Sequence, residues 1–111
     1  MIDFQRLLNA VTATGAGASV TFDRPSGYGT TRSKATFQGT VSGTGAVTAT
    51  VLVEVSNNAV NWLTLGTITL SGTTTASDGF AADAPWVWVR GNVTAISGTG
   101  AAVTLIQGLS K

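Results

Sequence analysis

The chain has 111 residues, a net charge of +1, charged residues at only 10% of the sequence, and neither cysteine nor histidine. This length fits one domain that buries roughly two-thirds of its unfolded surface around a single core. The missing cysteines exclude disulfides and thiolate metal sites, and the missing histidines remove the commonest general base and transition-metal ligand. Six scattered basic residues do not form the basic patch that is typical of nucleic-acid binding.

The first residues of the chain admit two structures. Residues 2–11 (IDFQRLLNAV) are the one segment whose apolar spacing fits a helix, which Asp3 would cap. Such a helix is too short to be stable unless it docks, and the same residues suit an extended arm. We therefore expect residues 1–17 to form an N-terminal arm or short helix and residues 18–111 to form the main domain.

From residue 18 onward the chain alternates between β-branched runs and turn signals. The clearest run is 46–56, where apolar residues occupy every second position, a period of two that no helix produces. Seven or eight strands are expected, among them 18–22, 35–41, 46–56, 60–65, 67–70, 86–96 and 102–107. Short strands with turn signals about every ten residues predict an all-β fold, an antiparallel β-sandwich of jelly-roll or immunoglobulin-like kind.

A glycine-rich sequence occurs twice, as SGTGAVT from Ser42 and as SGTGAAVT from Ser97. Glycine accepts the positive φ of a tight turn, so both copies are predicted to be turns that feed a β-branched strand in two similar halves. Phe80 is predicted to fill the core. The other turns and irregularities that we expect are an Asn57-Asn58-Ala59 turn, a bulge or kink at Gly66 and an Asp78-Gly79 turn.

The sequence offers few reactive groups. Asp78 and Asp83 are close in sequence. Three roles are open to them: turn residues, a catalytic carboxylate pair, or ligands of a calcium site completed by backbone carbonyls. No histidine can activate a serine or threonine, and neither Gly-Thr-Gly is followed by the lysine and helix of a phosphate loop. We therefore predict no enzyme, no cofactor and no metal site.

The three tryptophans are the main candidates for binding. In the strand 86–96, Trp86, Trp88 and Arg90 are predicted to share one face, with the valines on the other, and Trp62 lies in the predicted hairpin partner 60–65. Exposed, these rings would stack on sugars or form the centre of a subunit interface. Covered, they would close the edge of the core.

The loop 23–34 contains half of the basic residues of the chain. Arg24, Tyr28 and Arg32 are candidate contact residues in it, because long loops in compact domains often carry function. The loop would act either as a contact arm against an acidic neighbour or as a solvated loop.

Several strings resemble one family of proteins. They are VEVSNN (53–58) with WLTLG (62–66), SDGF (77–80) with APWVWVR (84–90), and VTAISGTGA (93–101). These strings resemble small β-sandwich structural proteins of tailed bacteriophages, and the resemblance extends over roughly residues 39–107. The resemblance supplies no catalytic residue.

The resemblance implies a virion component made in the cytoplasm of the host bacterium. We expect a capsid decoration (cement) protein or a head–tail component that self-associates and binds a major virion protein such as the capsid protein. Direct contact with nucleic acid or membrane is not expected. Two alternatives stay open: a carbohydrate-binding or host-surface-binding module, and a tail or fibre subunit.

Overall fold

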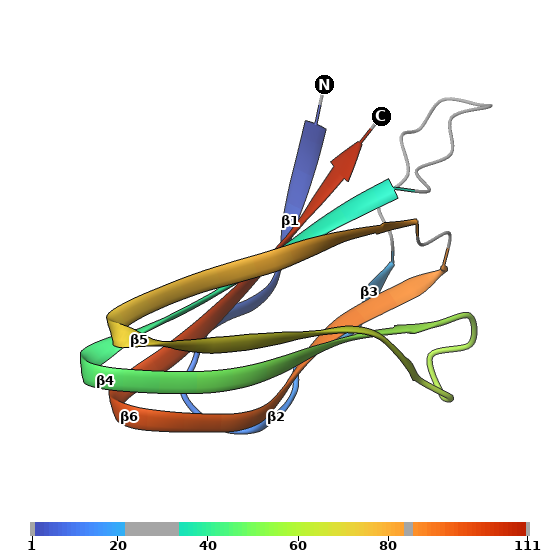
Figure 1. Cartoon of the computed structure of the whole chain (residues 1–111). Coiled ribbons are helices and arrows are strands. Elements are labelled where there is room, and N and C mark those ends of the chain that lie inside the picture. The colour runs from blue at the N-terminus through green and yellow to red at the C-terminus, as the bar shows by residue number, and fades with distance from the viewer. Residues whose placement is uncertain (1, 22–33, 84–85, 111) are drawn as a thin grey trace.

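The computed structural model describes residues 2–21, 34–83 and 86–110, which form an antiparallel all-β fold (Figure 1). The strands are β1 (Ile2–Val11), β2 (Gly15–Ala16), β3 (Val20–Thr21), β4 (Lys34–Ser56), β5 (Leu63–Asp83) and β6 (Trp88–Ser110). They are ordered β1-β6-β4-β5, and β2 and β3 also pair with β6. The predicted all-β class and antiparallel pairing are confirmed, and no helix able to cross a membrane occurs in this part of the chain.

Three long strands, β4, β5 and β6, each double back at the same end of the molecule and so contribute to two layers (Figure 1). We define the upper layer by residues 34–42, 75–83 and 101–110 with β1, and the lower layer by residues 46–56, 63–73 and 88–97 with β2 and β3. The molecule measures 48 × 31 × 18 Å. Its smallest dimension suits two sheets packed about 10 Å apart, with side chains on both outer surfaces.

The strands bend at one repeated sequence, which occurs three times rather than twice. Besides the copies at Ser42 and Ser97, β5 bends at Ser71-Gly72-Thr73-Thr74. The fourth residue of each copy has a positive φ: 79° at Gly45, 69° at Thr74 and 67° at Gly100. A residue in this left-handed region breaks the pleat of a strand and turns the chain out of its plane.

The glycine-rich copies are therefore corners inside strands, and the prediction of two hairpin turns is wrong. Thr44 of one copy pairs with Thr99 of the other, so the two corners lie side by side in neighbouring strands. A Cβ at Gly43 would lie 2.8 Å from the Thr99 carbonyl oxygen, and one at Gly98 would lie 2.5 Å from that of Ala46. Glycine is required at these positions because the neighbouring backbone passes too close for any side chain.

The core lies between the layers and follows the predicted alternation. Val47, Val51 and Val55 are at most 1% exposed, as are Phe37 and Leu105 from the upper layer. Large side chains of one layer fit against glycines of the other: Ile68 against Gly39, Phe80 against Gly66, and Leu105 with Leu8 against Gly91. The two layers thereby pack closely, and the predicted core position of Phe80 is confirmed by its packing against the cluster.

The N-terminal segment is a strand, and the helix considered for it is not seen. Ile2–Val11 forms β1, which pairs antiparallel with β6, and Leu7 and Leu8 are 6% and 3% exposed in the core. The register shifts between Arg6 and Leu8 and again between Leu8 and Val11. These bulges let two consecutive leucines reach the core. Because they interrupt the period of two, the apolar residues of this strand have a spacing that also fits a helix.

Of two other local predictions, one is confirmed and one is wrong. The register shift at Gly66 confirms the bulge expected there, since Val53 pairs with Gly66 whereas Glu54 pairs with Thr64. Asp78-Gly79 is not a turn, because both residues lie inside β5. Asp-Gly favours a turn only through its local backbone preference. The pairing of β5 with β4 along the whole strand outweighs that preference and keeps both residues extended.

Candidate interaction site

Exposed apolar side chains gather at the end of the sandwich opposite the corners. Among the described residues, the large hydrophobic side chains that are exposed are Val60 at 75%, Leu63 at 56% and Val87 at 36%. All three belong to the chain segments 56–63 and 86–90, which we call the loop end (Figure 1). Grouped exposed hydrophobics, unlike scattered ones, are typical of contact surfaces.

The loop between β4 and β5 is fixed by two polar side chains. The Ser56 hydroxyl oxygen accepts hydrogen bonds from the backbone N–H groups of Asn58 (3.1 Å) and Ala59 (3.0 Å), and the hydroxyl donates to Asn58 Oδ1 (3.0 Å). Asn58 Oδ1 also accepts from the N–H groups of Val60 and Asn61, at 3.0 and 2.9 Å. The turn predicted here is confirmed, and it presents Val60 to solvent on a rigid support.

A further hydrogen bond ties the start of β6 to this loop. The backbone N–H of Val87 donates to Asn57 Oδ1 at 3.2 Å, between residues far apart in the sequence. Val87 is thereby held beside the loop that carries Val60. The apolar residues of the loop end thus come from two segments that are fastened to each other.

A charged pair and a tryptophan support the outer face next to the loop end. Glu54 and Arg90 are opposite each other in the paired strands β4 and β6, and Arg90 Nε donates to Glu54 Oε1 at 2.7 Å. The two side chains are 13% and 25% exposed. The Arg90 guanidinium lies 4.2 Å from the centre of the Trp62 ring, which is cation–π geometry. This arrangement fixes Trp62 to the sheet.

The structure brings some of the predicted binding residues together. Trp88 and Arg90 are partly buried and alternate with Val89, which is 0% exposed, so the predicted outer face is correct for these two residues. Trp86 precedes β6 and packs against the core cluster instead of joining that face. Arg24, Tyr28 and Arg32 lie outside the described residues.

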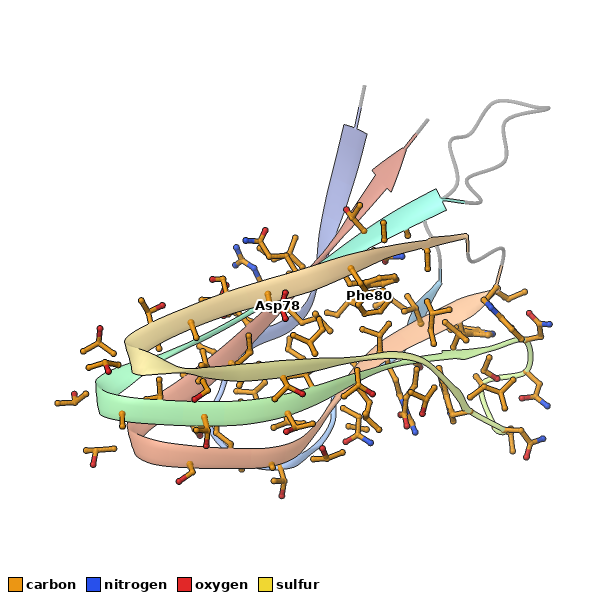
Figure 2. All side chains as sticks on the ribbon, in the orientation of Figure 1. Asp78 and Phe80 are labelled. Carbon is orange, nitrogen blue, oxygen red and sulfur yellow. The ribbon has the colours of Figure 1, made fainter. Side chains whose placement is uncertain are left out.

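The described carboxylates form no metal-binding cluster. Within residues 2–21, 34–83 and 86–110, no three acidic side chains are close enough to share a metal ion. Glu54 pairs with Arg90, and Asp78 Oδ1 accepts a hydrogen bond from the N–H of Gly79 at 2.8 Å. In Figure 2, Asp78 lies beside Phe80 on the side of β5 that faces the lower layer. The loop end, which offers apolar contact area on a rigid support, is therefore the better candidate site.

Sequence reasoning missed the residues that define the loop end. The sequence predicts Val60 in a hairpin strand and Val87 on the core face with Val89, but Val60 lies in the loop and Val87 is exposed before β6. Leu63 does begin the hairpin strand β5 as predicted, with its side chain exposed. A signal was present in Ser56-Asn57-Asn58, because a serine followed by asparagines is typical of a loop that binds its own backbone. Such a loop exposes the apolar residue that follows it. Comparison with protein-family models, with curated proteins and with solved structures gives no match.

Proposed function

We propose that this chain is a structural protein of a tailed-bacteriophage virion, a capsid decoration protein that attaches to the capsid through its loop end. The observation that carries the proposal is the exposed trio Val60, Leu63 and Val87 at the loop end, where side-chain hydrogen bonds fix the β4–β5 loop and tie Val87 to it. A rigid apolar surface loses little conformational entropy when it binds. The resemblance of residues 39–107 to small phage structural proteins supports the choice of partner.

The surface suits a protein partner that binds through apolar and neutral polar contacts rather than through charge. The net charge is only +1, and the exposed faces of both layers are rich in threonine and serine. The patch of three residues is small, so the affinity of one copy is expected to be modest. Many copies arranged by the symmetry of a capsid would bind strongly through avidity, and self-association of neighbouring copies would add to it.

The carbohydrate-binding alternative is less well supported. Stacking on sugars needs free ring faces, but the Arg90 guanidinium covers one face of Trp62, and Trp86 packs against the core. A tail or fibre subunit would use the same loop end and differ in its partner, so the choice between head and tail depends on the binding experiment.

The test is co-sedimentation of the purified protein with DNA-filled heads and, separately, with tails of the phage that encodes it. We expect the wild-type chain to bind heads, and we expect Val60→Asp and Leu63→Asp to reduce that binding at least tenfold. Thr36→Asp, at an exposed position of β4 in the upper layer, is the matched control and should bind like the wild type. Binding that survives both loop-end substitutions would reject the loop end as the attachment surface, and binding to tails alone would reject the decoration role.

A further inference from the structure

The strand β5 is an edge strand along its whole length. It pairs with β4 over the 21 residues from Leu63 to Asp83, and no other described strand pairs with its second side (Figure 1). Because β5 runs through both layers, it leaves one unpaired row of backbone N–H and C=O groups in each of them. Such rows are templates for pairing with another strand.

The other edges of the fold are either partly covered or interrupted by register shifts. On the opposite side of the lower layer, β6 is covered in part by β2 and β3. On the opposite side of the upper layer, β1 has two register shifts that interrupt its regular edge. Natural edge strands are commonly protected by lysine, proline or bulges. The bulge at Gly66 interrupts the start of β5, but the residues that follow it, 67–73, contain no charged residue, no proline and no register shift.

Apart from the bulge at Gly66, the protection that β5 has is confined to its upper half. Asp78 pairs with Gly39 and so lies on the inward face with Phe80, although the edge position leaves it exposed (Figure 2). An inward-facing charge on an edge strand opposes the approach of a second strand. The lower half of β5 has no such charge, so the two halves of the same edge differ in their capacity to pair.

We propose that the regular part of the lower half of β5, residues 67–73, pairs antiparallel with the same segment of a second copy of this chain across a two-fold axis. The proposal rests on the proposed function, because it names the surface of the self-association described there. An identical partner satisfies every free backbone group on both edges and brings no like charges together, since the segment is neutral. No other strand edge of the described chain is both regular and uncharged.

The side chains of the segment fit this partner on both faces. Thr67, Thr69, Ser71 and Thr73 are exposed on the outer face, where a two-fold axis near Leu70 would place Thr67 opposite Thr73 and Thr69 opposite Ser71 of the second copy. Cross-strand threonine pairs stabilise antiparallel sheets. Ile68 and Leu70 are 2% and 1% exposed on the inner face, so the core of one copy would continue into the next.

The experiment measures the oligomeric state of the full chain by sedimentation velocity over a range of concentrations. We expect a dimer for the wild type and at least a tenfold weaker dimer for Thr67→Lys and Thr69→Lys, which would place ammonium groups at the shared edge. Thr48→Lys is the control, because Thr48 is exposed in the same layer but belongs to β4, which has neighbours on both sides. Circular dichroism checks that each variant remains folded.

A second measurement locates the contact. The chain has no cysteine, so single cysteines in place of Thr69, Ser71 or Thr48 can be joined specifically by a short bis-maleimide reagent. Cross-linked dimers from the first two variants and not from the third support the proposal. A dimer that the lysine variants leave unchanged overturns the β5 contact but leaves self-association in place. A monomer at every concentration overturns both, and the head-binding experiment then still decides the attachment role.

Discussion

The ring of Phe80 rests against the backbone of Gly66, a residue from the earlier half of the same strand. A Cβ added at Gly66 would lie 2.7 and 2.8 Å from the two Cε atoms of Phe80 and would collide with Cζ. The contact exists because β5 doubles back at Ser71–Thr74, which places its two halves in facing layers. The two halves of β5 therefore pack against each other through a glycine.

Gly66→Ala is expected to lower the free energy of unfolding by about 1–3 kcal/mol, because the added methyl group overpacks the site of Phe80. Gly39→Ala should cost less, since its Cβ would lie 3.3 Å from Ile68 Cγ2 and that side chain can shift. The measurement is urea denaturation followed by tryptophan fluorescence. Adding Phe80→Leu to Gly66→Ala should recover part of the loss, and strictly additive effects would show that the two residues are not coupled.

Thr74→Gly is expected to stabilise the protein by about 1 kcal/mol, because a β-branched residue at positive φ is strained and glycine is not. The substitution makes the corner of β5 match the other two, which have Gly45 and Gly100 at this position. Thr75→Gly, at the next residue, is the control and should destabilise, because it adds chain entropy without relieving strain. Thermal unfolding of both variants tests this, and equal shifts in Tm would contradict it.

Asn58→Asp is expected to leave stability unchanged or slightly raised at neutral pH. All three of the hydrogen bonds described for the Asn58 side chain end on Oδ1, which accepts from Ser56, Val60 and Asn61. A carboxylate can accept the same three, and hydrogen bonds to a charged acceptor are stronger. Asn58→Ala removes the acceptor and should cost about 1–3 kcal/mol. Chemical denaturation distinguishes the two, and a large loss in Asn58→Asp would contradict the assignment of Oδ1.

Trp62 and Arg90 are expected to be coupled by about 0.5–1 kcal/mol in a double-mutant cycle of Trp62→Leu and Arg90→Leu. The guanidinium is held over the ring by its hydrogen bond to Glu54, so Glu54→Gln, which keeps an acceptor, should preserve most of the coupling. A cycle of Trp62→Leu with Thr36→Ala, in the other layer, should give none. The cycle is measured in urea at low and high salt, and coupling that vanishes in high salt would indicate a solvated contact.

The valine alternation of residues 46–56 predicted both the strand and its buried face, because burial on one side of a sheet imposes a period of two on the sequence. The glycine-rich copies could not be assigned in the same way. A tight turn and a strand corner both need a positive φ, and the difference depends on whether a neighbouring strand continues alongside. The copy in β5 went unrecognised because Thr74 stands where the others have glycine.

The site was predicted in part. Alternation was enough to place Trp88 and Arg90 on one face, since that inference needs only the local period. Trp62 under Arg90 depends on the register of three strands and on the bulge at Gly66, which shifts all later positions of β5. Ala95 shows the same limit: strict alternation from Val93 would bury it, but a register shift after Val93 leaves it exposed.

The corners have a consequence for how the protein folds. Because β4, β5 and β6 each belong to both layers, neither sheet consists of chain that can form separately. Pairing of β4 with β5 can begin at the loop fixed by Ser56 and Asn58. It is complete only when it extends past the corners into the other layer, so formation of this one hairpin begins both sheets. We expect a single kinetic barrier with no species that has one sheet formed and the other unfolded.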